Sequence, residues 1–173
     1  MVLFDEHSGG RVSRWSLRFT VKAETKGEWT LKLRVPGWYA GEPVLSVNGE
    51  EQKTKQQEGY IEIRREWGKE DNVDVFFPSE VRFEKLEGAE EMVCAVDGPI
   101  VLAGLTDHDC GITGNLSDSG SILLPELSHT YGAFVWTQST YLTRKQRENF
   151  RVIPLYEVTD EKYTVYFSSG MNC

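Results

Sequence analysis

The chain has 173 residues, enough for one domain or for two small ones. Hydrophobic residues make up 39% and charged residues 27%, a balance typical of a folded, water-soluble domain and not of a disordered chain. The formal net charge of −8 argues against nucleic acid and anionic membranes as partners, because both call for a basic face. No apolar run approaches the ~20 residues that a membrane-spanning helix needs.

Alternation of apolar and polar residues dominates the first half of the chain. This period of two predicts strands at residues 15–22 and 29–35. A turn at Gly27 separates them, so we expect the two strands to pair as an antiparallel hairpin. Pro36-Gly37 ends the second strand, because proline cannot donate a hydrogen bond to a sheet.

Three further strands are predicted at residues 44–47, 60–67 and 73–78. Asn48-Gly49 directly follows the first of them and is the strongest short-range hairpin signal, since both positions accept positive φ angles. These strands extend the same antiparallel pattern, and no long helix is indicated.

Two continuous apolar runs follow, at residues 92–96 and 100–105, with a turn at residues 97–99 between them. Strands of this kind are buried on both faces, so another sheet or a partner domain must cover them. The last two strands are predicted at residues 150–156 and 163–167.

Nine or ten short strands joined by turns predict an all-β fold, an antiparallel β-sandwich of the jelly-roll type. We expect residues 1–10 to form a disordered or loosely ordered N-terminal segment. Residues 11–168 are predicted to form a single sandwich domain, with a sub-boundary near residues 88–106 as the alternative. Residues 169–173 are predicted to form a C-terminal tail.

The residues that could carry metal or catalytic chemistry are scattered. His7, His108 and His129 have no partner at metal-ligand spacing. The run at residues 107–110, Asp-His-Asp-Cys, lies in a polar segment, and consecutive residues on extended backbone point to opposite faces. We find no GxSxG elbow and no glycine-rich phosphate loop, and nothing selects one pair among the acidic residues. The sequence therefore predicts no catalytic residue, no metal site and no cofactor.

Trp38 and Tyr39 are the best candidates for carbohydrate binding. They follow the turn at Pro36-Gly37 and stand outside the alternating pattern, where an aromatic ring is free to stack on the apolar face of a sugar. In the alternative interpretation, Trp38 closes one end of the core or packs against a neighbouring domain.

Several segments resemble one family of enzymes. Residues 31–38 (LKLRVPGW) are similar to the LRIPxW strand of the β-L-arabinofuranosidases of glycoside hydrolase family 127. Residues 44–49 and 60–67 resemble the VxVNG and GYxxIxRxW motifs that follow it there. Residues 93–103 resemble the GPLVLA strand, and residues 153–166 resemble the PLYxIHDxRYxVYW terminus. The resemblance extends over about residues 11–168, with the motifs in the family's order.

In that family these segments form β-sandwich regions that follow an (α/α)₆ barrel. The barrel carries the catalysis, which in characterised members uses a zinc-bound cysteine nucleophile and glutamates. No segment here matches the barrel, so no catalytic residue is carried over to this chain. One local departure is Val158-Thr159-Asp160, which stands where the family has Ile-His-Asp.

The resemblance implies a non-catalytic accessory domain from the C-terminal region of a larger glycoside hydrolase, and not an enzyme on its own. The expected partner is the (α/α)₆ barrel of that enzyme, with a plant polysaccharide or oligosaccharide and a second copy of the chain as further candidates. A carbohydrate-binding module is the first alternative function, and an adhesive or scaffolding sandwich is the second. A periplasmic, a secreted and a cytoplasmic location of the parent enzyme all stay open.

Overall fold

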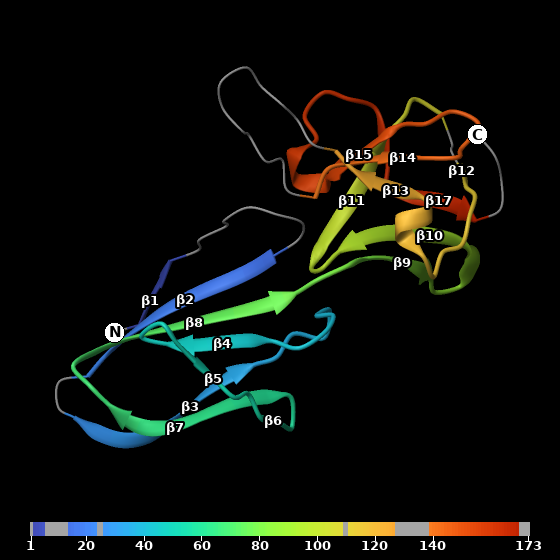
Figure 1. Ribbon diagram of the computed structural model, residues 1–173. Helices are drawn as coiled ribbons and strands as arrows, with labels where there is room; N and C mark the ends of the chain where they lie inside the picture. The colour runs from blue at the N-terminus through green and yellow to red at the C-terminus, as the bar shows by residue number, and fades with distance from the viewer. Residues whose placement is uncertain (1, 6–13, 24–25, 109–110, 127–138, 170–173) are drawn as a thin grey trace. The chain divides into compact units, whose positions relative to one another are not determined.

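The computed structural model describes residues 2–5, 14–23, 26–108, 111–126 and 139–169 (Figure 1). Its contacts divide the chain into two compact units, with the boundary between Ser79 and Glu80. The single domain expected at residues 11–168, or a sub-boundary near residues 88–106, stays a prediction, and the division by contacts lies before that alternative sub-boundary. The physical reason is a hairpin: the apolar strand at 92–96 pairs with the strand just before it, so both belong to the second unit.

The first unit contains eight strands in two sheets. In chain order the strands are β1 (Val2–Asp5), β2 (Arg14–Lys22), β3 (Gly27–Arg34), β4 (Val44–Val47), β5 (Glu50–Gln52), β6 (Gln56–Gln57), β7 (Tyr60–Trp67) and β8 (Glu70–Pro78). One sheet has the order β1-β2-β8-β4-β5, and the other has the order β3-β7-β6.

The predicted hairpin between residues 15–22 and 29–35 is wrong, although both strands exist. β2 pairs with β8 along its whole length, from Arg14 opposite Pro78 to Lys22 opposite Glu70. β3 pairs instead with β7 and lies in the other sheet. Alternation determines which side chains of a strand are buried, but it does not select the neighbouring strand.

The N-terminal segment, expected to be disordered or loosely ordered, is described at residues 2–5 only. Residues 2–5 form β1, which pairs antiparallel with β2 from Val2 opposite Val21 to Asp5 opposite Arg18. Without β1, β2 would present an edge of unpaired backbone N–H and C=O groups, and pairing satisfies them. Residues 6–10 lie outside the described residues, as do residues 170–173 of the predicted tail, whereas Ser169 ends a strand.

The two sheets of the first unit share one core, which confirms the all-β class and the sandwich arrangement. Alternate residues of β7 and β8 point inward, and Ile61, Trp67 and Val73 are each 0% exposed. The other buried members come from β2, β3 and β4 and from the segment after β3: Val21, Leu33, Val35, Leu45, Val47, Ile63, Val75 and Phe77. Residues at every second position on facing sheets are what a sandwich core requires.

The Asn48-Gly49 hairpin is confirmed. β4 and β5 pair up to Val47 opposite Glu50, and the two loop residues have φ angles of 54° and 82°. Asn48 also binds a buried carboxylate: its Nδ2 donates to Asp71 Oδ1 over 2.6 Å, and the Gly68 N–H donates to Asp71 Oδ2 over 2.5 Å. These bonds, led by the Asn48 amide, lower the pKa of Asp71 below its ordinary value of 3.8.

Asp71→Asn should therefore destabilise the first unit in a pH-dependent way. A carboxylate with a lowered folded-state pKa contributes stability above its ordinary pKa, and that contribution is lost as the pH falls through the folded-state value. We expect the variant to lose about 1–3 kcal/mol at neutral pH, the range for a hydrogen-bonded charged group. The difference in the free energy of unfolding between the variant and the unsubstituted protein should become smaller as the pH falls toward about 3. Thermal unfolding followed across this pH range measures the effect, and a gap independent of pH would contradict it.

The second unit is built on one connected sheet. Its strands are β9 (Val81–Leu86), β10 (Ala89–Asp97), β11 (Ile100–Leu105), β12 (Gly111–Ile112), β13 (Leu123–Pro125), β14 (Tyr141–Thr143), β15 (Arg151–Pro154), β16 (Tyr163–Thr164) and β17 (Tyr166–Ser169). Short 3₁₀ turns lie at Ser119–Ser121 and Leu155–Glu157. The sheet runs β12-β17-β10-β11-β15-β14-β13, with β9 on β10 and β16 on β11.

β11 connects the two halves of this sheet. It pairs with β10 at Ile100 and Val101, and then with β15 from Leu102 to Gly104. Gly104 and Leu105 also pair with β16, so Gly104 has a partner on each side. A strand that changes partners along its length lets one sheet bend around a core.

The second core differs in composition from the first. It contains Val93, Leu102, Val152 and Phe167, each 0% exposed, and it extends to the half of the sheet that holds β13 and β14. The two continuous apolar runs predicted as doubly buried strands form most of β10 and β11. The described residues contain seventeen strands, whereas the sequence predicts nine or ten. The number is higher because several strands have only two or three residues. No helix among the described residues has the length and apolar character needed to span a membrane.

Candidate functional site

Trp38 and Tyr39 lie at the edge of the first core and are half-buried. The Trp38 ring meets Phe77 edge-on, with ring centroids 6.3 Å apart and an angle of 77° between the planes. Tyr39 forms an isolated bridge with Ser79, and its hydroxyl lies 3.2 Å from the Gln56 side-chain amide. The Phe77 contact favours the interpretation in which Trp38 closes one end of the core. Sugar stacking at Trp38 and Tyr39 stays a prediction.

Of the polar run at residues 107–110, the structure describes Asp107 and His108. Asp107 Oδ1 and His108 Nδ1 are 2.8 Å apart, and the hydrogen bond to His108 lowers the pKa of Asp107. Asp109 and Cys110 lie outside the described residues, as do His7 and His129. Over the described ranges, no three His, Cys, Asp or Glu side chains gather closely enough to hold a metal ion.

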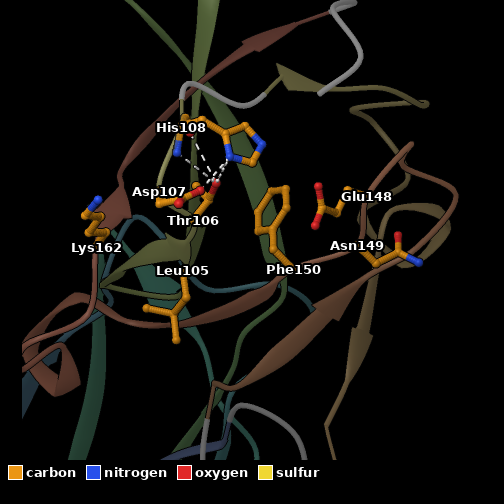
Figure 2. A pocket seen from close by; sticks show the side chains of 8 residues that line it. All are labelled: Leu105, Thr106, Asp107, His108, Glu148, Asn149, Phe150 and Lys162. Atoms are coloured by element: carbon orange, nitrogen blue, oxygen red, sulfur yellow. Dashed lines mark hydrogen bonds and ion pairs between the residues drawn. The ribbon is translucent and has the colours of Figure 1, made fainter.

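The structure places Asp107 and His108 in an open depression of the second unit, about 480 Å³ in volume, which we name the His108 depression (Figure 2). Three separate segments line it: residues 105–108 at the end of β11, residues 148–150 before β15, and Lys162 before β16. Pairing of β11 with both β15 and β16 brings these segments together.

Hydrogen bonds hold the walls of this depression in place. The Thr106 N–H donates to the Lys162 carbonyl over 3.1 Å, which ties the two segments on one side. On the other side, the Phe150 N–H donates to Thr143 Oγ1 over 2.8 Å. The Phe150 ring stacks on Phe167 at a centroid distance of 5.8 Å, so the apolar wall is anchored in the core.

A second depression of about 370 Å³ adjoins the first, because residues 106–108 and Lys162 line both. Its other wall is residues 161–164. The Glu161 carboxylate accepts hydrogen bonds from the Thr159 N–H and hydroxyl, each at 2.9 Å. These bonds, led by the backbone N–H, lower the pKa of Glu161.

Sequence reasoning singled out Asp107 and His108 but missed Glu148, Asn149 and Lys162. Residues 105–108 precede the other two segments by some forty residues or more, and no motif links the three segments. The sequence predicts strands at residues 150–156 and 163–167, but a period of two does not identify their partners.

The fold and the site define an all-β protein with a sandwich unit and, within the described residues, no metal-ligand cluster. Residues 13–79 match the family model of the β-L-arabinofuranosidase GH127 middle domain. This match confirms the resemblance found in the sequence. The model that matches is that of a middle domain, whereas the resemblance in the sequence had suggested a C-terminal region. A comparison with curated proteins found no match.

Solved structures of larger proteins share the fold of both units. A GH127 β-L-arabinofuranosidase from Geobacillus stearothermophilus T6 aligns with 97% of this chain at 21% identity and a TM-score of 0.64. A glycoside hydrolase aligns with 98% at 17% identity and a TM-score of 0.67. A GH127 β-arabinofuranosidase aligns with 97% at 21% identity and a TM-score of 0.59. The chain spans 30–32% of the length of these proteins.

Proposed function

We propose that this chain is a non-catalytic accessory β-domain of a β-L-arabinofuranosidase-type glycoside hydrolase, and that it packs on a helical catalytic barrel. The observation that carries the proposal is the match of residues 13–79 to the GH127 middle domain. The alignment of both units with about a third of larger glycoside hydrolases supports it, because the remaining two thirds of those proteins provide room for a catalytic domain.

The second unit offers an apolar surface for such a contact. Leu124 of β13 and Leu142 of β14 lie opposite each other in the ladder and are 43% and 40% exposed. Their neighbours in sequence, such as Leu123 and Tyr141, point into the core. Covering this leucine pair would remove apolar area from water at about 25 cal/mol per Å². The adjoining ion pair of Arg151 and Glu126, 2.7 Å apart, would lie at the rim of the interface.

A binding experiment tests this role. The chain is mixed with the helical barrel of a GH127 enzyme prepared without its β-region, and the Kd is measured by calorimetry. We expect Leu142→Asp to weaken binding about tenfold or more, since a charge would be buried at the centre of the contact. Leu86→Asp is the matched control, because Leu86 is 36% exposed in β9 and lies outside the leucine pair.

Two outcomes would contradict the proposed function. One is turnover of aryl β-L-arabinofuranosides by the purified chain alone, above the level of a mock purification. The other is an absence of binding between the unsubstituted chain and the barrel. An equal loss of binding in the Leu86 and Leu142 variants would instead place the contact away from the leucine pair.

A further inference from the structure

The His108 depression has polar groups that the accessory role does not use. The Glu148 carboxylate and the Lys162 ammonium group have no hydrogen bond or ion pair with any residue the structure describes, and both residues are exposed. Asn149 uses its Oδ1 to accept the Gln146 N–H over 3.2 Å, and its amide Nδ2 has no such bond within the described chain. Groups with free bonding capacity therefore line a concave surface.

These groups lie on both sides of an apolar wall. Figure 2 shows Lys162 on one side of Phe150, and Glu148 and Asn149 on the other. The Phe150 ring is 7% exposed and fixed by its stacking on Phe167, so it presents a small rigid apolar contact. Apolar surface with a few fixed polar groups around it is the usual composition of a small-molecule site.

The chemistry of the lining limits the class of ligand. An ionised carboxylate only accepts hydrogen bonds, and an ammonium group only donates them. An anion would be attracted by Lys162 but repelled by Glu148 and Asp107. An organic cation would be attracted by these two carboxylates but repelled by Lys162. A hydroxyl both donates and accepts, so a neutral ligand with several hydroxyls satisfies both kinds of group.

We propose that the His108 depression binds a neutral saccharide, with its hydroxyls bonded to Glu148, Asn149 and Lys162 and its apolar C–H face against Phe150. The volume of about 480 Å³ lies within the range of roughly 300–1,000 Å³ for small-ligand sites. The adjoining depression, which shares residues 106–108 and Lys162, gives room for a second sugar ring beside Tyr163, itself 50% exposed. This site is distinct from Trp38 and Tyr39, which belong to the first unit.

Saturation-transfer NMR on the whole 173-residue chain tests the proposal. The probes are L-arabinose, D-xylose, D-galactose and D-glucose, and shifts of the backbone amide signals give the Kd. We expect at least one sugar to bind with a Kd on the order of 1 mM. Affinity should stay unchanged up to about 0.5 M NaCl, because a neutral ligand has no charge to screen.

Substitutions assign the binding to this depression. Glu148→Ala and Lys162→Ala should each weaken it about tenfold, since each removes a hydrogen bond from a charged group. Glu90→Ala and Lys85→Ala are the matched controls, because this exposed pair joins β9 and β10 away from the depression. The controls should change the Kd less than about twofold. Circular dichroism checks that every variant keeps the fold.

Three results would overturn the proposal. The first is no saturation transfer to any of the sugars. The second is sugar binding that the Glu148 and Lys162 variants leave unchanged. The third is binding of acetate, ethylamine or alanine in place of the sugars, lost at high salt, which would assign the depression to a charged ligand. None of these results bears on binding to a catalytic barrel, so the proposed function is tested separately.

Discussion

Trp67→Ala should lower the free energy of unfolding of the first unit by about 3–5 kcal/mol. Trp67 is 0% exposed and is the largest of the fully buried side chains. Its ring stacks on Trp29 at 4.8 Å, and its Nε1–H donates to the Trp29 carbonyl over 3.0 Å. The Arg65 guanidinium lies 5.5 Å from the centre of the ring. Truncation would therefore leave a large cavity and remove this hydrogen bond. Chemical denaturation followed by circular dichroism measures the loss.

Two related variants separate the contributions at this position. Trp29→Ala should lower the free energy of unfolding by less than Trp67→Ala, because Trp29 is 39% exposed. Trp67→Phe keeps an aromatic ring but loses the indole N–H. We expect it to lower the free energy of unfolding by the contribution of one hydrogen bond, about 0.5–1.5 kcal/mol, or by more. If Trp67→Ala destabilises the unit by less than Trp29→Ala, Trp67 is not central to the core as we describe it.

Gly104→Ala should destabilise the second unit by about 1–3 kcal/mol, although it adds a single methyl group. A Cβ at Gly104 would lie 2.7 Å from Phe150 Cε2 and 2.8 Å from Phe167 Cε1. Both rings are buried and stacked on each other, so neither can move without disturbing the core. A van der Waals contact between carbon atoms needs about 3.5–4.0 Å, so the rings or the backbone must shift. Thermal or chemical unfolding measures the loss.

Gly27→Ala is the matched control, because Gly27 also lies in a strand and a Cβ there meets no atom within 4 Å. Its replacement should be neutral, or should stabilise the first unit by up to about 1 kcal/mol by restricting the unfolded chain. An equal loss of stability in the two variants would show that the loss comes from replacing a glycine in a strand, and not from a clash with Phe150 and Phe167. Because Gly104 and Trp67 belong to different units, their substitutions should affect different parts of the unfolding transition if the units unfold separately.

Much of the fold could be predicted from local sequence alone. The alternating runs correctly identify β2, β3, β7 and β8 and most of the side chains that face the first core, because side-chain direction in a strand follows directly from position. Trp29 of β3 is the exception, since it is 39% exposed. The Asn48-Gly49 turn is predictable for a similar reason, since its positive φ angles suit those two residue types. These features depend on neighbouring residues only.

Strand partners and the candidate site depend on contacts that are distant in sequence. β2 and β3 are consecutive but lie in different sheets, and β11 changes partners along its length. The site residues Glu148 and Lys162 meet the end of β11 only because of that change. Their own neighbourhoods are ordinary polar turns, in which an exposed charge is expected for solubility alone. No local pattern distinguishes them from other charged residues.

The position of β17 has a consequence for synthesis on the ribosome. This strand lies between β12 and β10, and its Phe167 is 0% exposed in the second core. β10 and β12 thus lack the strand between them until residue 169 has been translated, whereas every strand of the first unit precedes residue 80. A nascent chain would hold a finished sandwich followed by unpaired edges of β10 and β12, which are prone to join other chains. Products of premature termination would accordingly be targets for chaperones and proteases, even though their first half is correctly folded.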